Sequence, residues 1–114
     1  LIVDDNKKTG KQTQKMIEEI GLETQYADKG EEAIEICRSL REIDMLIIKP
    51  ELEGISGYET AKLIKQFRSE IAVIAATDKL LNEDKAKLFK NFFDDYISLP
   101  LNDQKFFLLA EKYL

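Results

Sequence analysis

Charged residues follow two short apolar runs of the sequence, at points where side-chain chemistry can be sought. Asp4 and Asp5 come directly after the apolar run that opens the chain, and Lys49 follows Met45–Ile48 and precedes Pro50. Two adjacent carboxylates are a reasonable start for a Mg²⁺ site, because hard divalent cations prefer oxygen ligands. Lys49 argues against a metal, since an ammonium group beside two carboxylates is already their counter-ion and repels a divalent cation. Lys49 is therefore the residue that a functional interpretation has to explain.

The ends of two later apolar runs complete a candidate pocket. Thr77 follows the run Ile71–Ala76, and Leu99 and Pro100 follow Tyr96–Ser98. In an open parallel sheet, ligands gather beyond the carboxyl ends of the strands, so these side chains are expected at one edge. The candidate pocket residues are Asp4, Asp5, Lys49, Thr77, Leu99 and Pro100.

The sequence offers no catalytic set to accompany these residues. The chain contains no histidine, and no second catalytic group stands beside Lys49, so a salt bridge is favoured over a Schiff-base nucleophile. Cys37 is the sole cysteine, lies among apolar residues and is interpreted as a buried apolar side chain. We expect no enzymatic activity and no cofactor. For Thr77, the sequence leaves open whether its hydroxyl serves a site or only ends a strand.

Composition limits the classes of function. With 114 residues, of which 44% are hydrophobic and 34% charged, the chain fits one compact domain over residues 1–114. A formal net charge of −5 disfavours direct binding to a nucleic-acid backbone. No apolar run approaches the roughly 20 residues that span a bilayer, so membrane contact is not expected. The chain starts without methionine, directly on a strand-like run, and we expect it to be a piece of a longer protein in the cytoplasm.

Apolar runs alternate with amphipathic segments along the whole chain. Strands are expected at residues 1–3, 22–27, 45–48, 71–76 and 96–98, and helices at about residues 6–20, 28–40, 56–67, 82–90 and 102–114. This alternation predicts an α/β fold, a doubly wound five-stranded parallel sheet with helices on both faces. The handedness of the crossovers leaves few topologies, and the flavodoxin-like order 2-1-3-4-5 is the natural choice.

Several residues have the spacing of helix caps. Asn6 is expected to cap the first helix, and Asp28 with Glu31 and Ser56 with Glu59 have the spacing of capping boxes. Leu101 and Phe106 are likewise placed as a hydrophobic staple at the start of the last helix.

In this combination and order, several motifs resemble a response-regulator (CheY-like) receiver domain, and the resemblance covers essentially the whole chain. The amino-acid sequences of these motifs most resemble those of receivers attached to hybrid sensor histidine kinases. The motifs are Leu1-Ile2-Val3-Asp4-Asp5-Asn6, Ala27-Asp28-Lys29-Gly30-Glu31-Glu32-Ala33, Gly57-Tyr58-Glu59-Thr60-Ala61, Ala75-Ala76-Thr77 and Asp94-Asp95-Tyr96-Ile97-Ser98-Leu99-Pro100.

The resemblance implies roles for individual positions. Receivers use an acid pair to hold Mg²⁺, an aspartate after strand three to accept a phosphoryl group, a hydroxyl on strand four and a lysine before the proline of strand five. By resemblance, Asp4 and Asp5 are the acid pair and Thr77 is the hydroxyl. Tyr96 matches an aromatic residue that commonly changes rotamer with phosphorylation, and simple packing is the other interpretation of this side chain.

The chain departs from the family pattern at the decisive positions. Lys49 stands where the phosphoacceptor is expected, and Leu99 stands where the strand-five lysine is expected. In addition, Leu52-Glu53 replaces the usual Met-Pro and Phe92 replaces a glycine. An amine cannot give the acyl phosphate that an aspartate gives, so the resemblance implies a degenerate pseudo-receiver with no bound metal and a relic acid pair. We expect Lys49 to pair with Asp4 or Asp5, because two carboxylates and one ammonium carry the same net charge as three carboxylates and a divalent cation.

The expected function is that of a non-enzymatic module in two-component (phosphorelay) signal transduction, which acts by protein–protein contact. The partner would be a kinase or an output domain of the same signalling system, and a homodimer through the same face is a further option. The expected contact face is formed by Leu81, Leu88, Phe92, Tyr96 and Phe106.

Two other functions are less consistent with the sequence. A receiver that takes phosphate on a neighbouring carboxylate such as Glu51 would need new strand-end geometry and new metal ligands. An FMN carrier on the same fold is disfavoured, because no loop rich in Gly, Ser or Thr follows the first strand. The acids Glu51, Glu53, Asp94 and Asp95 are most simply interpreted as a solvated surface.

Overall fold

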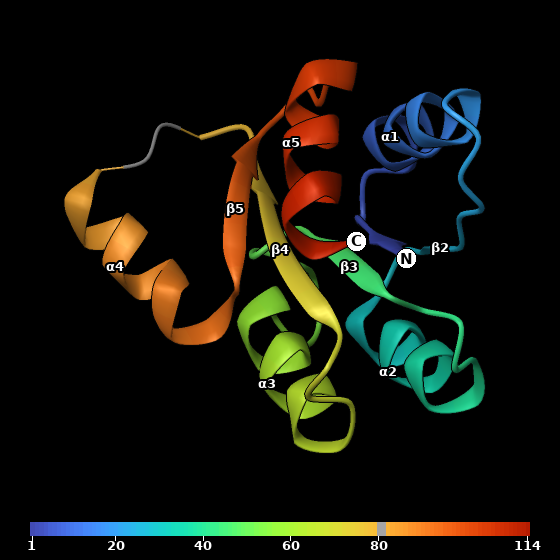
Figure 1. Cartoon of the computed structure of the whole chain (residues 1–114). Coiled ribbons are helices and arrows are strands. Elements are labelled where there is room, and N and C mark those ends of the chain that lie inside the picture. Colours follow the sequence, from blue (N-terminus) through green and yellow to red (C-terminus); the bar gives the residue numbers. More distant parts are fainter. Residues whose placement is uncertain (80–81) are drawn as a thin grey trace.

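The computed structural model describes residues 1–79 and 82–114 and shows a five-stranded parallel sheet between two layers of helices (Figure 1). The strand order is β2-β1-β3-β4-β5, which confirms the predicted fold class and topology. The elements are β1 (Ile2–Val3), α1 (Lys7–Glu19), β2 (Tyr26–Ala27), α2 (Gly30–Ser39), β3 (Met45–Ile48), α3 (Gly57–Phe67), β4 (Ala72–Thr77), α4 (Glu83–Phe92), β5 (Asp95–Ser98) and α5 (Asp103–Tyr113).

The central strands are buried along their whole length. Every residue of β3 and β4 is shielded from water, as expected for strands that are covered by helices on both faces. In the register of the sheet, Val3 is paired with Ile48, and Ile48 with Ala75. The carboxyl ends of β1 and β3 therefore lie level with each other, and β4 continues two residues further, to Thr77.

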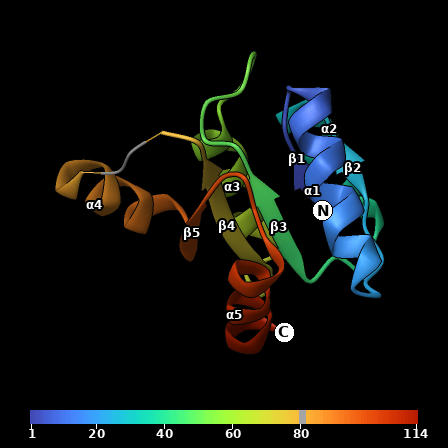
Figure 2. The ribbon, with the colours of Figure 1, turned by 90° about the horizontal axis from the view of Figure 1, so that it is seen from above.

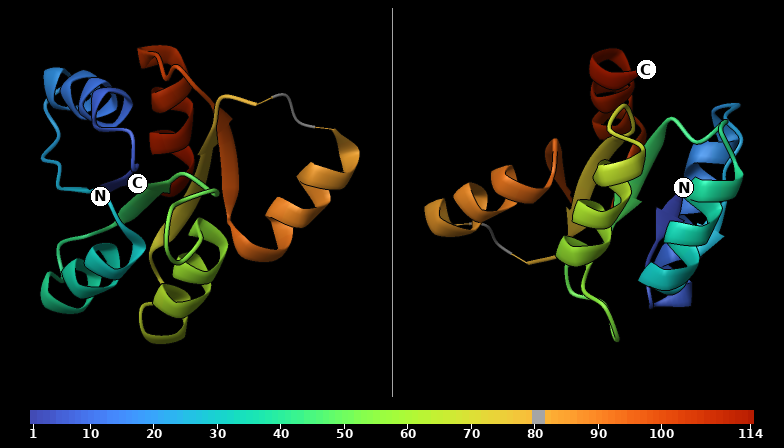
Figure 3. Two further views of the ribbon diagram at one scale, coloured as in Figure 1. Left: turned by 180° about the vertical axis from the view of Figure 1, so that it is seen from behind. Right: turned by 90° about the horizontal axis from the view of Figure 1, so that it is seen from below.

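Helices α1 and α5 cover one face of the sheet, and α2 and α3 cover the other (Figure 1 and Figure 3). Each face has its own apolar cluster. Ile17 of α1 and Leu109 of α5 belong to one cluster, whereas Cys37 of α2 and Ile64 of α3 belong to the other, as the interpretation of Cys37 required.

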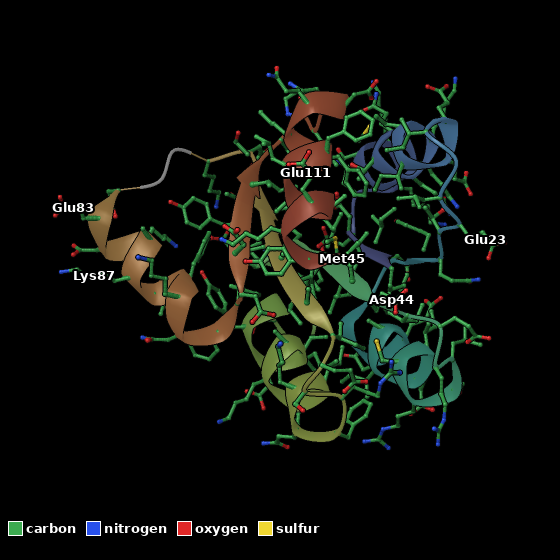
Figure 4. All side chains as sticks on the ribbon, in the orientation of Figure 1. Glu23, Asp44, Met45, Glu83, Lys87 and Glu111 are labelled. Carbon is green, nitrogen blue, oxygen red and sulfur yellow. The ribbon has the colours of Figure 1, made fainter. Side chains whose placement is uncertain are left out.

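Helix α4 projects from the β5 edge of the sheet (Figure 2). Phe89 is the one buried residue of this helix. Glu83 and Lys87 are exposed and lie on the side of α4 that faces away from the sheet (Figure 4). Contact between α4 and the body of the domain therefore depends on few side chains.

Most predicted helix starts are confirmed. The side chains of Asn6 and Ser56 accept hydrogen bonds from the backbone amides of Thr9 and Glu59 at 3.2 and 3.1 Å. Asn82 and Asn102 cap α4 and α5 in the same way. Helix α1 ends at the expected place, where Gly21 adopts a φ of +94°.

Two local predictions are wrong. Asp28 does not cap α2, because the helix begins after Lys29, whose side chain makes no capping bond. Glu31 instead accepts a hydrogen bond from the amide of Ile55 at 3.4 Å, so it binds the β3–α3 loop. The second strand is also shorter than the predicted 22–27, since residues 22–25 are too polar and exposed to extend it.

Arg68, directly after α3, holds the segment between α2 and β3 in place. Its guanidinium group is mostly buried and donates to four backbone carbonyls at the end of α2 and in the loop that follows. The accepting oxygens belong to Cys37, Leu40, Arg41 and Ile43, at 2.9 to 3.1 Å. These bonds satisfy carbonyl groups that the end of a helix leaves without partners.

Within residues 1–79 and 82–114, no helix has both the length and the apolar character required to cross a lipid bilayer.

Candidate functional site

Three strand ends place the candidate residues together at the carboxyl edge of the sheet. Asp4 and Asp5 follow β1, Lys49 follows β3, and Thr77 is the last residue of β4. The amide of Lys49 donates to the carbonyl of Val3 at 3.0 Å, which continues the β1–β3 ladder to the edge. The sheet itself therefore positions Lys49 beside the acid pair.

Lys49 forms an ion pair with Asp5. Its Nζ lies 3.3 Å from Oδ1 of Asp5, and the two side chains are 33% and 24% exposed. The other oxygen of the same carboxylate, Oδ2, accepts a hydrogen bond from the amide of Glu53 at 3.2 Å. Of the two partners that the sequence allowed for Lys49, the structure has Asp5, and this carboxylate also ties the β3–α3 loop to the end of β1.

Asp4 is more deeply buried, with 6% of its surface exposed. Burial raises the pKa of its carboxyl group, and the amide of Asn6, which donates to Oδ1 at 2.9 Å, and the charge of Lys49 oppose this shift. The carbonyl of Asp4 accepts a hydrogen bond from the hydroxyl of Tyr26 at 2.6 Å. Asp4 is thus held by its own loop and by β2.

The backbone of Lys49 is fixed from the side of α3. The amide of Gly57 donates to the carbonyl of Pro50 at 2.8 Å. A Cβ atom on Gly57 would lie only 2.2 Å from the carbonyl oxygen of Lys49, so α3 can approach the strand end this closely only with glycine there. This approach sets the direction in which the β3–α3 loop leaves the sheet.

The other predicted pocket residues lie on two sides of the edge. Thr77 is buried and its Oγ1 accepts a hydrogen bond from the amide of Lys79 at 3.1 Å. A cavity of about 30 Å³ beside it is lined by Lys49, Pro50, Glu51, Thr77, Asp78, Lys79, Lys85 and Phe89. Leu99 instead packs with the apolar cluster under α1 and α5, while Pro100 is exposed and joined to it by a cis peptide bond.

Sequence reasoning missed the role of Glu51. Its carboxylate is ion-paired with Lys79 and lies 3.7 Å from Nζ of Lys85, so it is more than a solvated surface group. The hydrogen bond from Lys79 lowers the pKa of the Glu51 carboxyl group. A signal was present in the spacing, because Glu51 and Lys79 each stand two positions beyond a predicted pocket residue, Lys49 and Thr77, and carry opposite charges.

Asp94 and Asp95 were also placed on a merely solvated surface, and the structure gives them partners. Asp94 accepts from the amide of Val73 at 2.7 Å and is ion-paired with Lys65 at 2.7 Å. Asp95 is ion-paired with Lys112 at 3.3 Å. These contacts fasten the amino end of β5 and do not reach the candidate pocket.

The predicted contact face is only partly present. Leu88 and Tyr96 are 39% and 37% exposed, and Phe92 is half-buried with its ring 5.3 Å from that of Tyr58. Phe106 is 2% exposed, so its assignment to the face is wrong; as the inner member of the staple with Leu101, it belongs to the core under α5. Leu81 lies outside the described residues. The sequence reasoning also missed Phe107 and Leu108 of α5, which are exposed.

The acid pair as arranged does not fit a divalent cation. Both oxygens of Asp5 are engaged, one by the ammonium of Lys49 and one by the amide of Glu53. In the part of the chain that the structure describes, no group of three or more His, Cys, Asp or Glu side chains is placed to hold a metal ion. Asp5 is therefore satisfied by protein donors at both of its carboxylate oxygens.

Parallel strands in the order 2-1-3-4-5, with an acid pair after the first strand and a hydroxyl at the end of the fourth, define the class of receiver domains found in response regulators. A family model described as the response regulator receiver domain matches residues 1–111, and the chain belongs to this family. The predicted membership of the receiver family is thereby confirmed, and the domain is the receiver domain of a two-component response regulator.

Individual relatives agree with this assignment. The polar-differentiation response regulator DivK of Brucella anthropi is 30% identical over 116 residues, which cover all of this chain and 94% of that protein. The receiver domain of NtrX from Brucella abortus has a TM-score of 0.86 at 22% identity, and the match covers 99% of this chain and 95% of that one. Chemotaxis protein CheY4 of Vibrio cholerae has a TM-score of 0.87 at 19% identity, with the same coverages. At these identities the two structures support the fold.

Proposed function

We propose that this receiver domain is a pseudo-receiver, which signals through protein contact and without an aspartyl phosphate. The observation that carries the proposal is the ion pair between Lys49 and Asp5 at 3.3 Å. An ammonium group at the end of β3 has no carboxylate oxygen on which an acyl phosphate could form. Held in this pair, it also places a positive charge where a divalent cation would have to bind.

Charge balance explains why the fold tolerates the lysine. Two carboxylates and an ammonium carry the same net charge as the three carboxylates and divalent cation of a phosphorylatable receiver. Leu99 is consistent with this balance, because a second ammonium at its position would add repulsion near Lys49. In the proposed state, Lys49 takes the place of both the missing acid and the missing metal.

Receiver domains interact with kinases or output domains, and we propose that this domain contacts such a partner through α4 and β5. Leu88 and Tyr96 are the exposed large hydrophobic side chains there, and Leu108 of α5 is also exposed. A homodimer through the same face is the alternative use of this surface. We place the domain in the cytoplasm, within a longer signalling protein such as a hybrid sensor histidine kinase, and assign it no catalytic activity.

The alternative is a receiver that is phosphorylated on Glu51. The ion pairs of Glu51 with Lys79 and Lys85 count against it, because they occupy the carboxylate that would have to attack the phosphodonor. Glu51 is also the third residue beyond the end of β3, two positions after Lys49.

Intact-mass measurement after incubation with acetyl phosphate and Mg²⁺ tests the proposal. A receiver with an aspartate at the end of its third strand serves as the positive control and should gain one phosphoryl group. We expect this chain to gain none. A stoichiometric adduct would overturn the proposal, and its loss in Glu51→Gln but not in Glu53→Gln would establish the alternative.

A further inference from the structure

We propose that Glu51 is a positioning residue that fixes α4, and with it the contact face, by bridging from the β3–α3 loop to Lys79 and Lys85. These three side chains are called the Glu51 bridge below. The inference rests on the proposed function only in that α4 carries part of the contact face. The bridge itself is independent of whether the domain accepts phosphate.

The bridge joins segments on both sides of the pocket. Glu51 belongs to the loop after β3, Lys79 to the segment that follows β4, and Lys85 to the first turn of α4. The hydrogen bond from Lys79 holds the pKa of Glu51 below its usual range, and the same bond raises the pKa of Lys79. Both groups are therefore charged at neutral pH, as a bridge of this kind requires.

The loop that carries Glu51 is itself anchored to the body of the domain. Asp5 accepts from the amide of Glu53 at 3.2 Å, and Glu31 of α2 accepts from the amide of Ile55 at 3.4 Å. The carbonyl of Pro50 accepts from the amide of Gly57 at the start of α3. The bridge thus connects α4 to a fixed part of the structure, and through Asp5 to Lys49.

Helix α4 has little else that would fix its position. Within the described residues, the pair of Lys85 with Glu51 is the one ion pair that links α4 to another element. Phe89 and Phe92 also make aromatic contacts, with the ring of Tyr58 at 6.0 Å from Phe89 and 5.3 Å from Phe92. Aromatic pairs are favourable over a range of offsets and tilts, so they define the position of a helix less strictly than directed charge contacts do.

Tyr58 of α3 makes the contact between α3 and α4 less favourable. Its hydroxyl oxygen is buried and has no hydrogen-bond partner among the described residues. Burial and the nearby charge of Glu51 raise the pKa of this hydroxyl group. A buried polar group without a partner disfavours the packed arrangement, so the Glu51 bridge acts against a tendency of α4 to move away from α3.

Hydrogen exchange of the wild-type chain and of Glu51→Gln tests the inference. Because removing the charge of Glu51 breaks only weak, solvent-exposed ion pairs, exchange of the α4 amides should become roughly two- to fivefold faster. The amides of β3 and β4 should be unaffected. Glu53→Gln is the matched control, because it removes an equal charge from the same loop, and none of the ion pairs of the described residues includes the Glu53 side chain.

Two further measurements separate a specific bridge from a general loss of charge. Lys85→Gln should reproduce most of the effect of Glu51→Gln, because it removes the pair that reaches α4, and the double variant should exchange about as fast as Glu51→Gln alone. Added salt should speed α4 exchange in the wild type but have little effect in Glu51→Gln. Unchanged α4 exchange in Glu51→Gln, or an equal change in Glu53→Gln, would overturn the inference. A phosphoryl adduct would overturn the proposed function alone, so the two failures are distinguishable.

Discussion

Replacing Lys49 with methionine tests whether its ion pair stabilises the domain. Methionine keeps the apolar part of the side chain and removes the charge, so the packing of the lysine stem is largely retained. Asp5 then loses one of its two partners and keeps the amide of Glu53. The expected consequence is a lower free energy of unfolding in the absence of metal.

The exposure of the pair sets the size of the effect. Removing one partner from a buried pair costs roughly 3–5 kcal/mol, whereas a solvated pair contributes about 0–1 kcal/mol. Lys49 and Asp5 keep a third and a quarter of their side-chain surface in water, so solvent screening brings the pair near the lower limit. We expect Lys49→Met to lower the free energy of unfolding by about 1 kcal/mol.

Urea unfolding at neutral pH with a chelator present is the appropriate assay. Lys62→Met is the matched control, because Lys62 is an exposed lysine of α3 that takes part in none of the ion pairs of the described residues. A cycle with Asp5→Asn isolates the coupling, which should also be about 1 kcal/mol. Equal effects of the Lys49 and Lys62 substitutions, with no coupling to Asp5, would refute a structural role of the pair.

Three further predictions follow from the same contacts. Lys49→Asp should be less stable than the wild type without metal, and Mg²⁺ should raise its melting temperature but not that of the wild type; at a metal concentration about a hundred times Kd, the stabilisation is about 2.7 kcal/mol. Asp4 has a folded-state pKa above its unfolded value, so its ionised form lowers stability at neutral pH, and Asp4→Asn should raise the melting temperature there. That gain should fall as the pH drops through the folded-state pKa and vanish below about 3.8, and a gain independent of pH would contradict the assignment. Arg68→Ala should lower the free energy of unfolding by on the order of 2–4 kcal/mol, because four backbone carbonyls lose a charged donor, while Arg41→Ala should change it by less than about 0.5 kcal/mol.

The central part of the fold follows directly from local patterns in the sequence. Met45–Ile48 is apolar throughout because both faces of its strand are covered, and residues 72–76 repeat this pattern. Asn6 and Ser56 are side chains whose oxygens reach an amide three residues on, so the starts of two helices were predictable. Where the local preference and the tertiary environment agree, the prediction holds.

The errors arise where a distant partner competes for a side chain. Glu31 has the right spacing for a capping box with Asp28, but the amide of Ile55 lies within its reach and α2 begins one residue later. Phe106 was assigned to the contact face, although it packs into the core and leaves Phe107 and Leu108 of the same helix exposed to water. Such outcomes depend on contacts between segments that the sequence alone does not place.

The candidate site was predictable in part for the same reason. Strand ends meet at one edge of a parallel sheet, so Asp5 and Lys49 could be brought together from topology alone. The choice of Asp5 over Asp4 depends on burial, since Asp4 lies deeper and is held by the amide of Asn6. The Glu51 bridge depends on the path of the β3–α3 loop, which Asp5 and Glu31 fix through backbone amides that no sequence pattern marks.

A crystal structure determined from crystals grown in Mg²⁺ tests the proposed pseudo-receiver most directly. The proposal predicts the ammonium of Lys49 within ion-pair distance of Asp5 and no metal at the acid pair. Magnesium coordinated by Asp4 and Asp5, with the side chain of Lys49 turned out into solvent, would contradict it.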